Sequence, residues 1–196
     1  MPETGNPRHR SRTMSSPRIL LPHPDCRIHP GLELRARVIR LVGAGLAIHY
    51  LLTGDLSRIR VPKGPIPARA DGLWRHTCCE AFVAGAETPA YREFNFSPDG
   101  RWQVYDFTAY RHGGPLDTAS APAIDCETSH GGLELRARLA ADLLPSGHPL
   151  RIGLSAVLED LDGGLSYWAL RHPPGKPDFH HPDTFALEID LQEAPR

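Results

Sequence analysis

Three stretches of the sequence bring hydrogen-bonding side chains close to a tryptophan. They are RADGLWRHTCCEAF (Arg69–Phe82), EFNFSPDGRWQVYDFTAYR (Glu93–Arg111) and LSYWALRHPPGKPDFHHPDTF (Leu165–Phe185). Aromatic rings cover the apolar C–H faces of a sugar, while carboxylates and amides pair with its hydroxyl groups. These residue types therefore favour a surface that holds a sugar or a similarly polar small molecule.

The first stretch has the alternation of a strand. Alternation places Trp74, His76 and Glu80 on one face, where Trp74 would be a stacking platform and the other two would bind hydroxyl groups. The alternative is structural. Trp74 then lies in the core at a strand start, and Glu80 pairs with an arginine.

The second stretch contains the hairpin loop Ser97-Pro98-Asp99-Gly100-Arg101, in which Gly100 takes the left-handed position. This register predicts a core face of Phe94, Phe96, Trp102 and Val104. The opposite face carries Glu93, Asn95, Gln103, Tyr105 and Phe107, which makes it the candidate concave binding face.

The third stretch is a strand that runs into a proline-rich loop. Trp168 and His172 lie toward the strand end, and the prolines stiffen the loop that carries Lys176, Asp178 and His180. A stiff loop of this composition suits the rim of a binding site. A surface loop with solvated histidines is the alternative.

Other chemistries find less support. The spacing of His172, Asp178, His180 and His181 matches no metal motif, so we expect no metal and no cofactor. The nucleophile-elbow, Walker and His-Glu-x-x-His motifs are absent. Glu80 and Glu93 on neighbouring strands could form an acid–base pair, which keeps a small hydrolase or isomerase as an alternative. A protein-interaction domain is a third possibility.

The elements that must position these residues are strands. Period-two alternation marks strands near residues 32–41, 45–54, 73–85, 90–97, 133–143, 150–160, 165–172 and 184–191. With the strand after Gly100 this makes about nine short strands and no required helix, so we predict an all-β, antiparallel two-sheet sandwich of jelly-roll type. The string LELRAR occurs at Leu32–Arg37 and again at Leu133–Arg138, either as neighbouring strands of one pattern or by coincidence.

Composition supports one domain without a nucleic-acid or membrane partner. The 196 residues carry 22 basic and 23 acidic side chains, and no apolar run reaches membrane-span length. We expect residues 1–16 to be a disordered tail, with Met14 as an alternative start, 17–191 to be the domain and 192–196 a short tail. Residues 1–17 lack the apolar segment of a secretory signal, which predicts a cytoplasmic location and reduced, buried cysteines.

The chain resembles the bacterial DOMON-like family, which is related to the family 9 carbohydrate-binding modules. The resemblance lies in RADGLWRHTCCEAF, in EFNFSPDGRW with Tyr105 after it, in LAIHYLLTGDL (Leu46–Leu56) and in YWALRHPPGKPDFHHPDTF (Tyr167–Phe185). It implies a jelly-roll sandwich that binds sugars, or in other branches haem, without an established enzymatic activity. Cys79 stands where the family pattern leads us to expect an aromatic residue.

The resemblance implies a set of ligand-binding positions and no catalytic ones. The haem branch would need an axial pair such as methionine and histidine, and both methionines, Met1 and Met14, lie in the tail. We therefore expect a non-catalytic module for a carbohydrate or a sugar-derived metabolite. Its candidate binding residues are Trp74, His76, Glu80, Glu93, Asn95, Trp102, Tyr105, Trp168, His172, Lys176, Asp178 and His180.

Overall fold

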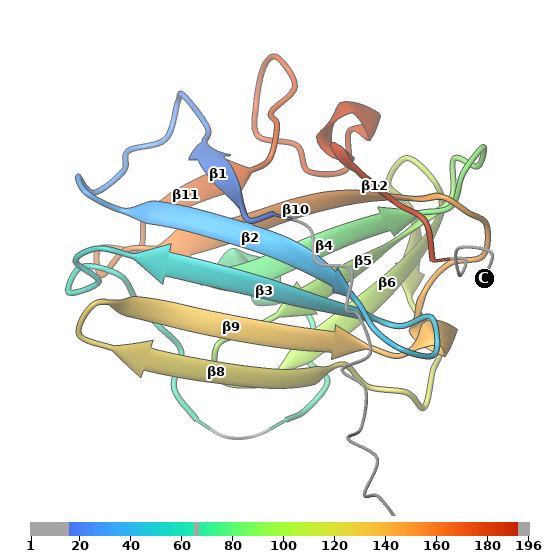
Figure 1. The fold of residues 1–196 in the computed structure, drawn as a ribbon. Coiled ribbons are helices and arrows are strands. Elements are labelled where there is room, and N and C mark those ends of the chain that lie inside the picture. Colours follow the sequence, from blue (N-terminus) through green and yellow to red (C-terminus); the bar gives the residue numbers. More distant parts are fainter. Residues whose placement is uncertain (1–15, 65–66, 192–196) are drawn as a thin grey trace, which may run out of the picture.

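The chain folds into a β-sandwich, which confirms the predicted all-β, antiparallel class (Figure 1). The computed structural model describes residues 16–64 and 67–191. The predictions for the two tails, and for Met14 as a start, lie outside these residues except at Ser16. The jelly-roll type of connection stays a prediction.

The front layer in Figure 1 is a four-stranded sheet. Its order is β2, β3, β9, β8, and every neighbouring pair is antiparallel. The bounds of these strands are Glu33–Arg40 for β2, Leu46–Thr53 for β3, Gly132–Leu139 for β9 and Ala123–Ser129 for β8.

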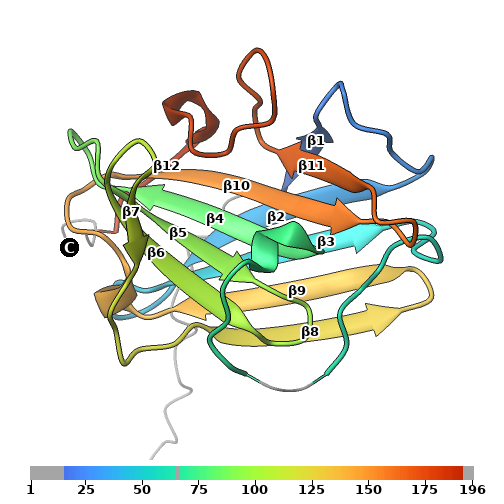
Figure 2. The same cartoon turned by 180° about the vertical axis from the view of Figure 1, so that it is seen from behind.

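The back layer, which faces the viewer in Figure 2, runs in the order β7, β6, β5, β4, β10, β11, with β12 also paired to β10. The bounds are His112–Pro115 for β7, Trp102–Ala109 for β6, Tyr91–Phe96 for β5, Cys78–Ala84 for β4, Leu150–Glu159 for β10, Leu165–Ala169 for β11 and Leu187–Ile189 for β12. Strand β1 (Arg18–Pro22) pairs with β2 through its first half and with β11 through its second half. It therefore joins the two layers along one edge.

The main core lies between the layers, and the hairpin register predicted from Gly100 is correct. Phe96 pairs with Trp102 and Phe94 with Val104, and all four side chains are buried in this core. Gly100 has a φ of 89°, in the left-handed region that its turn requires. A two-residue period on β5 and β6 thus separates core residues from those on the outer face.

The repeated LELRAR string occupies β2 and β9, which are not neighbours because β3 lies between them. Both copies direct their alternate residues, Leu34 and Ala36 on β2 and Leu135 and Ala137 on β9, into the core. The repeat therefore reflects a shared in-out pattern around a common central strand.

Several predicted strand bounds are wrong, and three strands were not predicted. Residues Leu73–Arg75 form a 3-10 helix, η1, before β4 begins, because Gly72 enters it with a φ of 71°. Short 3-10 helices, η2 (Ala141–Leu143) and η3 (Pro182–Thr184), likewise shorten β9 and β12 at one end. Strands β1, β7 and β8 are short or largely exposed, so they carry little hydrophobic alternation.

The cysteines behave as small apolar residues. Cys78 and Cys79 are buried on opposite faces of β4, as alternation predicts, and Cys26 and Cys126 are half-buried and free. Across residues 16–64 and 67–191, none of the helices has the length and apolar character to cross a membrane.

Candidate functional site

The outer face of the back sheet is hollowed into a cavity of about 550 Å³. The sheet forms its floor, η1 contributes Trp74, and the proline-rich loop after β11 contributes Lys176, Pro177, Phe179 and His180. A cavity of this volume has the size of a typical small-molecule site. Its lining consists of Trp74, Glu80, Phe82, Glu93, Tyr105, Phe107, Arg111, Val157, Tyr167, Lys176, Pro177, Phe179 and His180.

Two buried carboxyl groups lie in this cavity. Glu80 on β4 and Glu93 on β5 are only 2% and 5% exposed. Burial raises the pKa of Glu93 to about 7, although the amide of Asn95 donates to its Oε1 at 2.6 Å and lowers the pKa in part. Burial and the nearby charge of Glu93 raise the pKa of Glu80 well above its ordinary value. Burial therefore favours the protonated form of both carboxyl groups.

Glu80 has fewer hydrogen-bond partners than Glu93. Its Oε1 has no hydrogen-bond partner within the described part of the chain. The buried hydroxyl group of Ser155, directly opposite on β10, faces this carboxyl group and lowers the pKa of Glu80 only in part. A carboxyl group with so few partners in a cavity lining is a candidate to contact a ligand.

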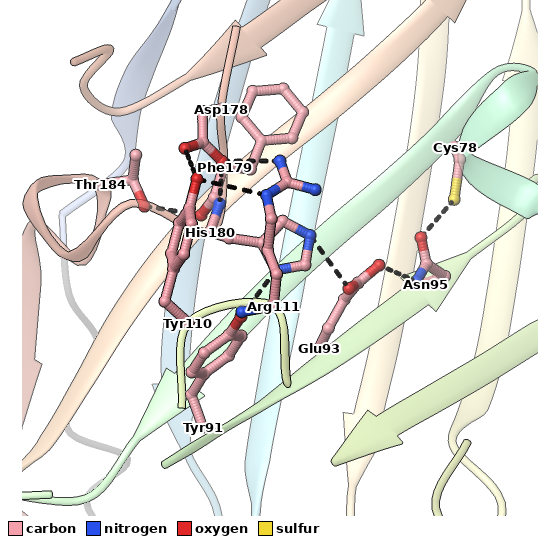
Figure 3. Close-up of polar contacts among 10 residues, drawn as sticks. All are labelled: Cys78, Tyr91, Glu93, Asn95, Tyr110, Arg111, Asp178, Phe179, His180 and Thr184. Carbon is pink, nitrogen blue, oxygen red and sulfur yellow. Dashed lines mark hydrogen bonds and ion pairs between the residues drawn. The ribbon is translucent and has the colours of Figure 1, made fainter. Parts of the chain in front are cut away.

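A hydrogen-bonded network holds His180 and Arg111 in the cavity wall (Figure 3). The Nδ1 atom of His180 lies 2.8 Å from the Tyr91 hydroxyl group, which accepts the backbone N–H of Arg111 at 3.0 Å. Burial, with the charge of Arg111, lowers the pKa of His180 to about 4, so the ring is neutral at pH 7. Its Nε2 atom is 3.6 Å from Oε2 of Glu93.

Asp178 holds the guanidinium group of Arg111 in place. The guanidinium group donates to Oδ1 of Asp178 at 2.8 Å, and the hydroxyl group of Tyr110 donates to Oδ2 at 2.7 Å. The β6–β7 turn that carries Arg111 is irregular, with a register shift after Phe107 and a φ of 55° at Arg111. Gly113 permits this turn, because a Cβ atom there would lie 2.0 Å from the carbonyl oxygen of Asp106.

The cavity brings together half of the twelve predicted site residues, from all three stretches. The residues that line it are Trp74, Glu80, Glu93, Tyr105, Lys176 and His180. Glu93 lines the cavity as a buried group. Trp74 lines the cavity from η1, not from a strand, and remains 44% exposed.

Two further predicted residues, Asn95 and Asp178, hold lining residues of the cavity in position. Asn95 is completely buried, and its amide holds Glu93 while its carbonyl oxygen lies 3.6 Å from Sγ of Cys78. Asp178 holds Arg111 and accepts the backbone N–H of His180 at 3.1 Å. Neither residue lines the cavity, so their contribution is to position residues that do.

The structure places both other predicted tryptophans away from the cavity. Trp102 and Trp168 lie in the core between the layers, 7% and 2% exposed, so the interpretation that they contact a ligand is corrected. The indole N–H of Trp168 donates to Oγ of Ser166 inside that core. On β11 the residue that faces the cavity is the neighbouring Tyr167.

Two predicted histidines also lie outside the cavity lining. The Nδ1 atom of His76 lies 2.8 Å from Oε2 of Glu159, and the His76 side chain is 59% exposed. His172 lies 2.8 Å from the backbone oxygen of Leu21 and packs its ring against His23. Both histidines connect structural elements instead of facing the site.

Seven lining residues were not among the selected site residues. Alternation had placed Phe107 on the binding face without selecting it, and it could have indicated Phe82 two positions after Glu80 on the same strand. No local pattern indicates Arg111, because an irregular turn brings it to the cavity. The other missed residues are Val157, Tyr167, Pro177 and Phe179.

The cavity has the donors and acceptors for a polar organic ligand. Within residues 16–64 and 67–191, no three histidine, cysteine or acidic side chains are grouped so that they could hold a metal ion. Six lining residues, Trp74, Phe82, Tyr105, Phe107, Tyr167 and Phe179, supply aromatic rings. The arrangement can therefore stack a ring-shaped ligand and hydrogen-bond to its edge.

The carboxyl pair should make stability fall at high pH. We expect the free energy of unfolding to decrease by about 1–3 kcal/mol between pH 6.5 and pH 8, measured by urea unfolding at each pH. A carboxyl group whose pKa is raised on folding stabilises the protein fully below its unfolded-state pKa. That stabilisation is lost as the pH rises through the folded-state value, which is about 7 for Glu93.

The measurement starts at pH 6.5 because His180 changes the stability at lower pH. Its lowered pKa has the opposite effect, because stability lost on acidification returns as the pH rises between about 4 and its ordinary value of 6.5. His49 and His172, whose pKa values burial also lowers, act in the same direction as His180, and all three effects fade as the pH rises above 6.5, where the decrease caused by the carboxyl pair dominates. Glu80→Gln should flatten the decrease, and a wild-type protein whose stability is constant or rises from pH 6.5 to 8 would contradict the assignment.

The comparisons with known proteins show the fold. The structure is similar to that of a protein from Bacteroides uniformis, described provisionally as carbohydrate-binding, with 15% identity, a TM-score of 0.58 and coverage of 89% of this chain and 86% of that one. It is also similar to a family 9 carbohydrate-binding module from Caldicellulosiruptor kristjanssonii in complex with glucose. That match has 12% identity, a TM-score of 0.51 and coverage of 94% of this chain and 86% of the module.

These likenesses are structural only. No family model matches the chain, and no curated protein matches its sequence. At 12–15% identity the chain shares the β-sandwich fold of these proteins, and its ligand has to be argued from its own cavity.

Proposed function

We propose that this protein is a non-catalytic binding module for a carbohydrate or a sugar-derived metabolite, which it holds in the cavity on the back sheet. The observation that carries the proposal is one cavity lined by six aromatic side chains and two buried carboxyl groups. The fold shared with a glucose-bound family 9 module supports it. Membership of the DOMON-like family remains part of the proposal.

The cavity matches the requirements of sugar binding in size and in chemistry. Its volume of about 550 Å³ accommodates one or two sugar rings. Carboxyl groups in different protonation states can both accept from and donate to the hydroxyl groups of a sugar. Trp74, at the entrance, presents an aromatic surface that is still 44% exposed and can cover a sugar face.

Removing this aromatic surface should weaken sugar binding with little effect on stability. We expect Trp74→Ala to reduce the affinity for glucose, or for the best ligand of a sugar and sugar-phosphate panel, by about tenfold or more in isothermal calorimetry. The midpoint of thermal unfolding should change little, because Trp74 lies on a short, exposed helix.

The matched control is Leu51→Ala. Leu51 is 42% exposed and lies on β3, in the other sheet, so its truncation should leave sugar affinity unchanged. If no sugar of the panel binds, the proposed function is wrong. Equal losses of affinity in both variants would show that Trp74 is not part of the site.

One observation favours the enzyme alternative as a second candidate. Glu80 and Glu93 line the same cavity with raised pKa values, which is the condition that an acid–base pair of a hydrolase or isomerase needs. NMR spectra of each bound sugar, incubated with equimolar protein, separate the candidates. An unchanged sugar supports a binding module, and conversion that Glu80→Gln abolishes supports the enzyme.

A further inference from the structure

Among the described residues, neither carboxyl group of the cavity is hydrogen-bonded to a cationic side chain, although the charge of Arg111 lowers the pKa of Glu93 in part. Oε1 of Glu80 has no hydrogen-bond partner within the described residues, and Glu93 is held by the neutral amide of Asn95. The side chain of Glu80 is 98% buried, yet it lines the cavity. A buried carboxylate without a paired cation is unfavourable, and its site favours a ligand that supplies the missing charge.

The basic groups around the cavity do not fill this role. Arg111 is already paired with Asp178 at 2.8 Å, and burial keeps His180 neutral. Lys176 lies on the exposed loop, where it makes no ion pair or hydrogen bond with either carboxyl group in the part of the chain that the structure describes. The remaining polar neighbours, the Ser155 and Tyr105 hydroxyl groups, are uncharged at neutral pH.

The walls of the cavity also favour a cation. Aromatic side chains surround the carboxyl groups. They are Trp74, Phe82, Tyr167, Phe179 and, from β6, Tyr105 and Phe107. The faces of such rings are electron-rich and attract ammonium groups, most strongly where water is excluded. Aromatic walls around buried carboxyl groups thus form an environment suited to an ammonium group.

We infer that the cavity selects a sugar that carries an amino group, whose ammonium lies against the Glu80–Glu93 pair. This inference rests on the proposed function and specifies its ligand class. An ammonium group has three donors, and both carboxyl groups line the same cavity close enough for the charge of Glu93 to raise the pKa of Glu80, so one ammonium group can pair with both residues. The sugar ring then packs against the aromatic walls.

Calorimetry at pH 7 with matched sugars tests the inference. The probes are glucose, glucosamine, 6-amino-6-deoxyglucose and N-acetylglucosamine, so that the ring is shared while the charge and its position change. We expect at least one of the two amines to bind about tenfold or more tightly than glucose, as a charged hydrogen bond in a buried site would produce. N-acetylglucosamine should show no such gain.

Two variants locate the effect. Glu80→Gln keeps the size of the side chain and removes the ionisable group, so it should lower the affinity for the amine about tenfold more than the affinity for glucose, which abolishes the preference. Glu127→Gln on the outer face of β8, where the carboxylate is exposed, should retain the preference. Thermal unfolding confirms that each variant is folded, and if Glu80→Gln does not fold, the wild-type comparison of amine and glucose still decides.

The outcomes separate the inference from the proposed function. If glucose binds as tightly as both amines, or if Glu80→Gln retains the preference, the inference is overturned and the sugar-binding proposal stands. If none of the four probes binds, and no sugar of the wider panel binds, both fail.

Discussion

Truncation of Phe94 to alanine should lower the free energy of unfolding by about 3–5 kcal/mol. Phe94 is completely buried at the centre of β5, stacked on Phe96 with ring centroids 6.3 Å apart. The variant loses this packing and leaves a cavity between two sheets that cannot fully close over it. Urea unfolding at pH 6.5 measures the difference.

The control for Phe94→Ala is a truncation at the surface. Val42 is 77% exposed, so Val42→Ala should change the free energy of unfolding by less than about 0.5 kcal/mol. The same measurement also tests the register of the β5–β6 hairpin. A loss below about 1 kcal/mol for Phe94→Ala would mean that the core face of β5 is assigned incorrectly.

Trp168→Ala should have a similarly large effect, again about 3–5 kcal/mol. Its indole is 98% buried between the sheets and donates a hydrogen bond to Ser166, which the variant would lose. Sugar affinity, measured at a temperature where the variant is folded, should be unchanged because Trp168 does not line the cavity.

The comparison between Trp168→Ala and Trp74→Ala tests the placement of the two tryptophans directly. The first should lose stability and keep binding, and the second should lose binding and keep stability. If Trp168→Ala instead unfolds at the wild-type denaturant concentration but no longer binds sugar, Trp168 belongs to the site and the structural assignment is wrong.

Much of the fold could be predicted from local patterns. Alternation along β2, β3, β9 and β10 is clear because one side of each strand faces the core. The turn chemistry at Gly100 determined the register of β5 and β6. Strands β1, β7 and β8 were missed because they lie at sheet edges or between layers, where hydrogen bonding and not burial defines them.

The candidate site was predictable only in part. The sequence indicated Glu80, Glu93 and His180 by residue type, but it also selected Trp102 and Trp168, which are equally aromatic and lie in the core. On β11 the error is a single position, since Tyr167 and Trp168 point to opposite faces. Residue type alone cannot separate a core aromatic residue from one in a binding site.

The sequence by itself determined an all-β chain, its main hairpin and the two-residue period that places each side chain on one face of a strand. Only the tertiary structure decided which face is covered by the second sheet and which is hollow. It also brought Arg111 and His180, far apart in sequence, into the cavity that holds the carboxyl pair. The physical reason is that local periodicity depends on near neighbours, whereas a cavity depends on how distant segments pack across a sheet.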